Sequence, residues 1–151
     1  MNNNYKEAYQ KASAFCAMSE KCEQDVRKKL QKWEVFKQDA DRIIAQLKLD
    51  DFLNDIRYCE AFVKDKFRFN RWGKVKIAFE LKTKNLPSEA IYDAIDKIDE
   101  DEYLSSLQEL LNAKKRTIKK GTQYEIQVKL YKFALSRGFE SDLVKQLIID
   151  N

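Results

Sequence analysis

The sequence carries the same apolar pattern three times, and this repetition restricts the possible folds more than any other feature. Shifting the chain by 51 residues places seven apolar positions on seven others without a gap, and a further shift by 53 continues the pattern. Repeats of this length form one structural unit each, and neighbouring units stack to bury a shared apolar face. We therefore expect burial at the positions that correspond across the copies, which include Leu30, Leu81 and Ala134, and Ile44, Ile95 and Ile148.

Each copy is predicted to be helical. Its apolar residues are spaced by three and four over two consecutive segments, as in amphipathic helices, and a third such segment precedes them. One proline and three glycines leave few helix breakers in 151 residues. We predict an all-α fold of three tandem three-helix, helix-turn-helix-like repeats in an elongated, curved row, a single domain with modules at 5–49, 50–99 and 100–151. The expected helices are 5–17, 20–33, 38–48, 55–69, 71–84, 89–99, 101–118, 123–136 and 142–149.

Residues with capping chemistry stand near the expected helix ends. A polar side chain that accepts a backbone N–H favours a helix start, which predicts N-caps at Ser19, Asn54, Ser88, Thr122 and Ser141. Gly138 is expected as a left-handed C-cap. Gly73 falls in the first turn of an expected helix, where glycine is less stable than alanine, so we expect a close approach by a neighbouring helix or a partner there.

Composition excludes several classes of protein. No apolar run approaches the about 20 residues of a membrane span, and the start MNNNYKEAYQ lacks the features of a signal peptide, so we expect a cytoplasmic protein without membrane contact. The three cysteines, Cys16, Cys22 and Cys59, form no CxxC motif, and histidine is absent. We expect buried thiols, no disulfide framework, no metal site and no cofactor.

Charge is distributed in bands along the chain. Residues 64–84 hold eight basic residues and two acids, and residues 114–137 hold eight basic residues and one acid. Between them, residues 87–110 hold eight acids and one lysine. Both basic bands fall at the end of a module's first helix and on its second helix. A basic face can bind phosphates or an acidic protein surface, but helices of many soluble proteins also carry solvated charged faces.

Two pairs of basic residues are one helical turn apart, Arg71 with Lys74 and Lys129 with Lys132, so each pair is expected to project from one helix face. The aromatic residues among the basic ones could stack on bases. We expect them in the core instead, since Trp72, Val75 and Phe79 are spaced as a buried stripe; the set is Phe67, Phe69, Trp72 and Tyr131. The repeats alone leave a protein-binding solenoid and a nucleic-acid module both open.

Three stretches have a more specific pattern. Residues 54–63 carry an acidic-x-Arg-aromatic-small-x-x-Phe motif, with Cys59 at the small position, and residues 71–74, Arg-Trp-Gly-Lys, open a basic helix ahead of Ile77. Residues 129–142 end in Ser-Arg-Gly-Phe before Asp142. In order and spacing they resemble the second and third modules of the RecX family, although Asn85 stands where that family tends to have glycine.

The resemblance implies a regulator, mainly an inhibitor, of the RecA recombinase. Such a protein binds along the RecA filament on single-stranded DNA and suppresses ATP hydrolysis, strand exchange and coprotease activity. We expect a monomer, and no catalytic activity, because the sequence has no histidine base, no Gly-rich phosphate loop and no GxSxG elbow. Direct contact with the DNA is left open. The alternative is a stand-alone DNA-binding protein that uses its basic bands without recombinase.

The residues expected to contact the filament or DNA are basic and come from four expected helices and the segments beside them. They are Arg57, Lys64, Lys66, Arg68, Arg71, Lys74, Lys76, Lys114, Lys115, Arg116, Lys119, Lys120, Lys129, Lys132 and Arg137. Five of them are expected to be exposed on a concave side that faces the filament, namely Arg71, Lys74, Lys115, Arg116 and Lys119.

Overall fold

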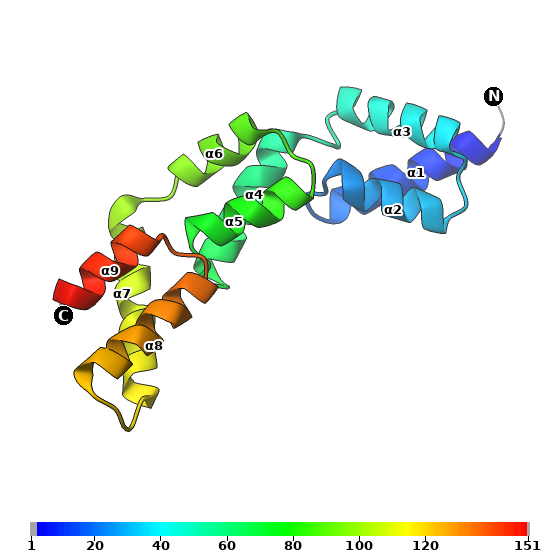
Figure 1. Cartoon of the computed structure of the whole chain (residues 1–151). Helices are drawn as coiled ribbons and strands as arrows, with labels where there is room; N and C mark the ends of the chain where they lie inside the picture. Colours follow the sequence, from blue (N-terminus) through cyan, green and yellow to red (C-terminus); the bar gives the residue numbers. More distant parts are fainter. Residues whose placement is uncertain (1–2, 151) are drawn as a thin grey trace.

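The computed structural model describes residues 3–150, which form nine α-helices and no strand. The helices follow one another in an elongated, curved row with the two ends of the chain far apart (Figure 1), so the predicted all-α repeat fold is confirmed. The bounds are α1 Asn3–Met18, α2 Glu23–Lys32, α3 Lys37–Leu49, α4 Asp55–Arg68, α5 Lys74–Thr83, α6 Ser88–Asp96, α7 Glu100–Thr117, α8 Gln123–Ser136 and α9 Ser141–Asp150. Met1, Asn2 and Asn151, which the sequence predictions included, lie outside the described residues.

Three helices at a time form a repeat: α1–α3, α4–α6 and α7–α9, named here modules 1, 2 and 3. The predicted correspondence between them is confirmed at both sets of positions. Leu30, Leu81 and Ala134 have no exposed surface. The second set is buried too, namely Ile44, Ile95 and Ile148.

The turn after each module's second helix is also repeated. Glu34, Asn85 and Gly138 all have left-handed backbone, with φ of 60°, 62° and 91°. The next amide N–H then donates to the carbonyl five residues earlier, at N···O distances of 2.9, 3.4 and 3.2 Å for Val35, Leu86 and Phe139. Glycine adopts this backbone most easily. The predicted role of Gly138 is confirmed, and Glu34 and Asn85 take the same conformation because packing of the module requires the turn.

The N-caps confirm two predictions and correct three. The side chains of Asn54 and Thr122 accept N–H bonds as expected. Ser88 and Ser141 lie inside α6 and α9, and Ser19 stands four residues before α2. Helices α2 and α5 begin three residues later than predicted. Their N-caps are Cys22 and Gly73, and neither residue has a conventional capping side chain. The contact of Gly73 with module 3 sets the start of α5, whereas α2 starts at a local cap in which the Asp25 carboxylate accepts the Cys22 N–H (3.1 Å).

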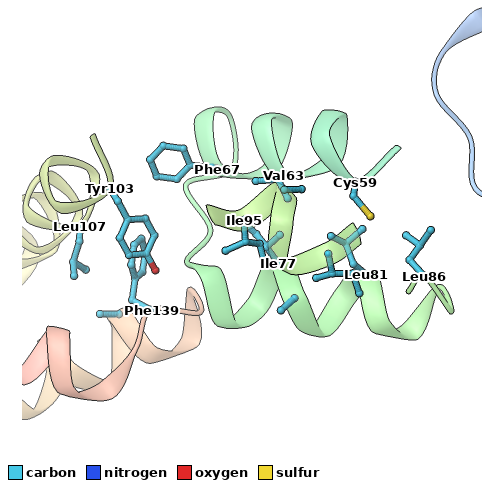
Figure 2. Close-up of a cluster of buried hydrophobic side chains, with 14 of the residues drawn as sticks. Cys59, Val63, Phe67, Ile77, Leu81, Leu86, Ile95, Tyr103, Leu107 and Phe139 are labelled. Carbon is cyan, nitrogen blue, oxygen red and sulfur yellow. The ribbon is translucent and has the colours of Figure 1, made fainter. Parts of the chain in front are cut away.

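Buried side chains form two separate cores. One lies within module 1 and includes Leu30 and Ile44. The other runs continuously through modules 2 and 3, from Cys59 to Phe139 (Figure 2). It also includes Cys22 from module 1. The predicted burial of the three cysteines as free thiols is confirmed.

Modules 2 and 3 meet backbone to backbone at a contact we call joint 2–3. The Gly73 N–H donates to the Arg137 carbonyl (N···O 2.7 Å), and the Val75 N–H donates to the Gly138 carbonyl (2.9 Å). A Cβ added at Gly73 would overlap the Gly138 carbonyl, and one added at Gly138 would overlap Lys76. The predicted close approach at Gly73 is confirmed, and the approaching group is the turn after α8.

Tyr103 of α7 closes the same joint. Its fully buried ring lies between Phe67 and Phe139, with ring centroids 5.8 and 5.2 Å away (Figure 2). Its hydroxyl accepts a hydrogen bond from the Lys74 N–H (2.9 Å) and donates one to the Glu140 carboxylate. Burial, together with that carboxylate, raises the pKa of the Tyr103 hydroxyl.

Joint 1–2, between modules 1 and 2, has the same layout with different contacts. Cys22 corresponds to Gly73 and lies buried against Tyr58, the fourth residue of α4 as Tyr103 is of α7. The Gln24 side-chain amide donates to the Thr83 carbonyl (N···O 3.4 Å). Side chains therefore make, at joint 1–2, the connection that backbone groups make at joint 2–3.

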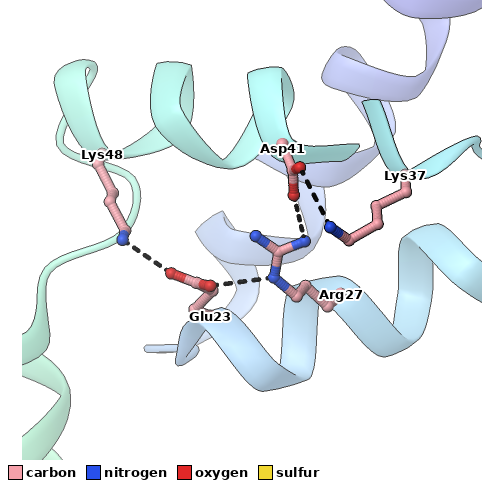
Figure 3. A network of polar contacts seen from close by, with 5 residues as sticks. All are labelled: Glu23, Arg27, Lys37, Asp41 and Lys48. Carbon is pink, nitrogen blue, oxygen red and sulfur yellow. Dashed lines mark hydrogen bonds and ion pairs between the residues drawn. The ribbon is translucent and has the colours of Figure 1, made fainter. Parts of the chain in front are cut away.

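Module 1 has its own polar network on the surface between α2 and α3 (Figure 3). Arg27 pairs with Glu23 on its own helix (3.0 Å) and with Asp41 on α3 (2.7 Å). Lys48 of α3 reaches back to Glu23 (2.8 Å). The network joins these two helices beside the module 1 core.

Candidate nucleic-acid interface

The second basic band is assembled by the end of α7, the following loop and α8. Lys114, Lys115 and Arg116 occupy the last turn of α7, where cations complement the helix dipole. The loop ends at Thr122, whose hydroxyl accepts the Glu125 N–H (3.1 Å) while that carboxylate accepts the Thr122 N–H (3.4 Å). This capping box starts α8 close to the end of α7, so basic residues far apart in sequence face one another.

Five lysines of this band line one open groove of about 780 Å³, named here the module 3 groove. The full lining is Lys114, Thr117, Ile118, Lys119, Lys120, Lys129, Lys132 and Phe133. The Phe133 ring lies under two cations, with the Lys114 ammonium and the Arg137 guanidinium 5.1 and 4.9 Å from its centroid. Within residues 3–150, no carboxylate lies within ion-pair distance of these groove lysines. Their charge is available to an external anion.

The first basic band has a different arrangement. Arg71 pairs with Glu109 (2.8 Å) and Lys74 with Glu100 (3.2 Å), so acids of α7 offset part of its charge. Lys74 is also half-buried, with its ammonium 4.5 Å from the centroid of the Tyr103 ring. The prediction that Arg71 and Lys74 share a helix face is wrong, because Arg71 lies before α5 with left-handed backbone (φ 56°).

The other predicted contact residues are distributed over module 2. Lys64 and Arg68 are exposed on α4, beside a pocket that also contains Asp99 and Glu102. Arg57 already binds two carboxylates at joint 1–2, those of Glu20 and Asp51, each at 2.9 Å. The structure thus brings together the lysines of the module 3 groove and places Arg57 apart from them, at joint 1–2.

Exposure of the five residues expected on a concave face is mixed. Lys115, Arg116 and Lys119 are exposed, and Arg71 is exposed although paired. Lys74 is half-buried, which contradicts its predicted exposure.

Sequence reasoning missed Phe133 as part of the groove. Its signal was present, because Phe133 is one helical turn from both Lys129 and Arg137. The predicted stripe of Trp72, Val75 and Phe79 is not buried: Val75 and Phe79 are exposed and Trp72 is half-buried. Phe69 is likewise exposed, against prediction, because it ends α4 and points away from both cores, whereas Phe67 is buried as expected.

Two other kinds of feature are absent from residues 3–150. No group of three or more side chains there is arranged to hold a metal ion. No helix in that part of the chain is long and apolar enough to cross a membrane.

Comparison with known proteins gives a consistent result. The model for the second three-helix domain of RecX matches residues 54–95, and the model for the third matches residues 100–148. A regulatory protein RecX of Clostridium beijerinckii is 30% identical over 149 residues, covering 97% of this chain and 69% of that protein. One from Prosthecochloris aestuarii is 24% identical, covering 97% of this chain and 95% of that protein.

Solved structures agree on the fold. The crystal structure of RecX from Lactobacillus salivarius is similar with a TM-score of 0.87 at 19% identity, covering 99% of this chain and 97% of that one. A second crystal structure, of a regulatory protein RecX, is similar with a TM-score of 0.88, also at 19% identity, covering 97% of this chain and 73% of that one.

Proposed function

This chain belongs to the RecX family of regulatory proteins, and we propose that it regulates the RecA recombinase, mainly as an inhibitor, in DNA repair by homologous recombination. A monomer binds along the RecA filament on single-stranded DNA in the cytoplasm. It suppresses ATP hydrolysis, strand exchange and coprotease activity through binding alone, without a reaction of its own.

The observation that supports this proposal most is the module 3 groove. Its five lysines come from α7, the loop and α8, and none has a carboxylate partner among the described residues. Cations held together in this way bind phosphates and release counterions when they do so. We assign the groove to a stretch of sugar-phosphate backbone within the filament, with Lys115, Arg116 and Arg137 beside it.

The elongated row supports the same function. The modules form a curved row (Figure 1), and such a row can contact several protomers of a periodic filament at once. Each contact then raises the effective concentration of the next, so several weak contacts give firm binding. The alternation of basic and acidic bands gives the row a preferred register on its partner.

The test is ATP hydrolysis by RecA filaments with this protein titrated in. The triple variant Lys119→Gln, Lys129→Gln, Lys132→Gln removes exposed groove charges without touching either core. We expect weaker inhibition, and a salt dependence of binding reduced by about 0.7 per lost contact with a single strand. The matched control is Lys6→Gln, Lys32→Gln, Lys37→Gln, three exposed lysines of module 1. Undiminished inhibition by the triple variant would contradict the role of the groove.

The second candidate is a stand-alone DNA-binding protein. The unpaired groove lysines favour it, because phosphate binding there requires no recombinase. Affinity for bare single-stranded DNA, compared with affinity for a preformed RecA filament at the same salt, separates the two. Equal affinities would support the stand-alone protein, and a strong preference for the filament would support the regulator.

A further inference from the structure

Aromatic rings and lysines alternate on one side of module 2, across α4 and α5. The Trp72 ring contacts that of Phe62 edge-on, with centroids 6.4 Å apart. The ammonium groups of Lys66 and Lys76 lie 5.1 and 4.5 Å from the centroid of Trp72. Phe79 follows Lys76 by one turn of α5. We call these five residues the aromatic face.

Phe79 is 62% exposed, and Val75, one turn before it, is 54% exposed. The repeat shows that the module does not need an apolar residue at this position. The residues that correspond to Phe79 in modules 1 and 3 are Lys28 and Lys132, and both are exposed. An aromatic ring there is specific to module 2 and contributes to neither core.

The aromatic face and the module 3 groove occupy equivalent sides of their modules. The shift of 53 residues relates Lys76 to Lys129 and Phe79 to Lys132. The first residue of each pair lies on α5 and the second on α8, the second helices of modules 2 and 3. Lys129 and Lys132 line the groove. A ligand that follows corresponding sides of α5 and α8 would therefore meet rings on module 2 and unpaired lysines on module 3.

We propose that the aromatic face binds unpaired bases of a single-stranded nucleic acid, which stack on Phe79 and Trp72 while Lys66 and Lys76 bind the flanking phosphates. Rings that alternate with cations recognise single strands without regard to sequence, because every base has a flat face and every nucleotide a phosphate. The lysines now lying over Trp72 leave its ring as they pair with phosphate. This inference rests on the proposed binding of DNA by the neighbouring groove and adds the base-binding part of that surface.

Tryptophan fluorescence tests the stacking directly. The chain has two tryptophans, Trp33 in module 1 and Trp72, so Trp33→Phe leaves Trp72 as the single reporter. We expect oligo-deoxythymidylate to quench its emission. A strand of the same length made of abasic sites offers phosphates but no bases, and we expect it to bind without comparable quenching. Binding of both strands with no difference in quenching would overturn the proposal.

The matched variants are Phe79→Ala and Phe36→Ala. Both replace an exposed phenylalanine, and Phe36 lies in module 1, away from the aromatic face. We expect Phe79→Ala to weaken oligo-deoxythymidylate binding by about 5- to 150-fold with an unchanged salt slope, since no phosphate contact is lost. Its affinity for the abasic strand should be unchanged, as should every affinity of Phe36→Ala.

The proposals for the groove and for the aromatic face can be contradicted independently. If the lysine variant of the groove loses DNA affinity while Phe79→Ala does not, the stacking proposal is overturned and the groove stands. If Phe79→Ala weakens inhibition of the RecA filament but not binding of bare strands, the aromatic face contacts protein and the stacking proposal is again overturned. Loss of base-dependent binding by Phe79→Ala supports it even if the groove variant binds normally.

Discussion

The two joints of the row have the same layout, but backbone groups connect one and side chains connect the other. At joint 2–3, Gly73 and Gly138 let two backbones meet through direct hydrogen bonds, and one core continues across the contact. At joint 1–2 the corresponding residues are Cys22 and Asn85, and module 1 keeps a core of its own. A side chain at position 22 prevents the equivalent close approach, so the connection depends on Arg57, Gln24 and the buried thiol.

This difference divides the chain into a rigid part, modules 2 and 3, and an attached part, module 1. Modules 2 and 3 share a core and should open together, because cooperative units follow continuous buried contacts. Module 1 can lose its structure, or change its angle, and expose only the part of that core where Cys22 lies against Tyr58. For the proposed binding along a filament, this arrangement would let module 1 adapt while the module 3 groove and the aromatic face keep a fixed relation.

The largest expected effects come from cutting each core. Leu30→Ala and Leu81→Ala remove the same fully buried side chain from corresponding positions, and each should cost about 2 to 5 kcal/mol. Hydrogen exchange, resolved by helix, should show Leu30→Ala increasing exchange in α1–α3 alone and Leu81→Ala increasing it throughout α4–α9. Equal loss of protection in all nine helices of the described chain with either variant would mean that the two cores act as one.

Adding a methyl group to the tight joint is expected to rank next. In Gly73→Ala the new Cβ overlaps the backbone of Gly138, and because neither backbone can yield cheaply we expect a loss of about 3 kcal/mol. The control is Cys22→Ala at the corresponding position, which removes one sulfur and should cost less. Denaturant unfolding measures both. A Gly73→Ala protein as stable as the wild type would show that joint 2–3 is no tighter than joint 1–2.

Tyr103→Phe keeps the ring packing at joint 2–3 intact and removes the hydroxyl. The Lys74 N–H and the Glu140 carboxylate then lose a partner, and an unsatisfied buried group costs about 1 to 3 kcal/mol. Tyr58→Phe makes the same change at joint 1–2, where no backbone N–H depends on the hydroxyl among the contacts of the described residues. We expect a smaller loss there, again measured by denaturant unfolding.

These contrasts also show which parts of the structure the sequence could predict. Apolar periodicity gave the helices and the corresponding core positions, because burial repeats with the module, as at Leu81 and Ala134. The start of α5 was missed because the contact of Gly73 with module 3 fixes it, and the start of α2 because a cysteine, Cys22, stands at its N-cap. The pairing of Lys74 with Glu100 joins residues 26 apart across two helices, and no local pattern encodes it. Phe79 followed the helical spacing of a core residue, but its position faces solvent in all three modules.

Low pH should reduce the stability of module 1 through protonation of Glu23, and this is the smallest of the expected effects. Hydrogen bonds from Lys48 and then Arg27 lower the pKa of this carboxyl below its usual value of 4.5, against the opposing effect of burial. A carboxyl with a lowered pKa in the folded state stabilises that state at pH above 4.5. This contribution is lost as the pH falls through the lower, folded value. Because the Glu23 side chain is 39% exposed, solvent screening limits the effect to about 0.2 to 1 kcal/mol.

The measurement is hydrogen exchange of α2 and α3 at pH 6 and pH 3, after correction for the intrinsic rate. Glu23→Gln should reduce protection of these helices at pH 6 and make it less sensitive to acid, since the titrating group is gone. Glu7→Gln is the control, because among the described residues Glu7 pairs only with Lys11 along α1 (3.9 Å), and both side chains are exposed. If Glu23→Gln changed the protection of α7–α9 as much as that of α2 and α3, module 1 would be energetically coupled to the far end of the row. The division between an attached module and a rigid pair would then be wrong.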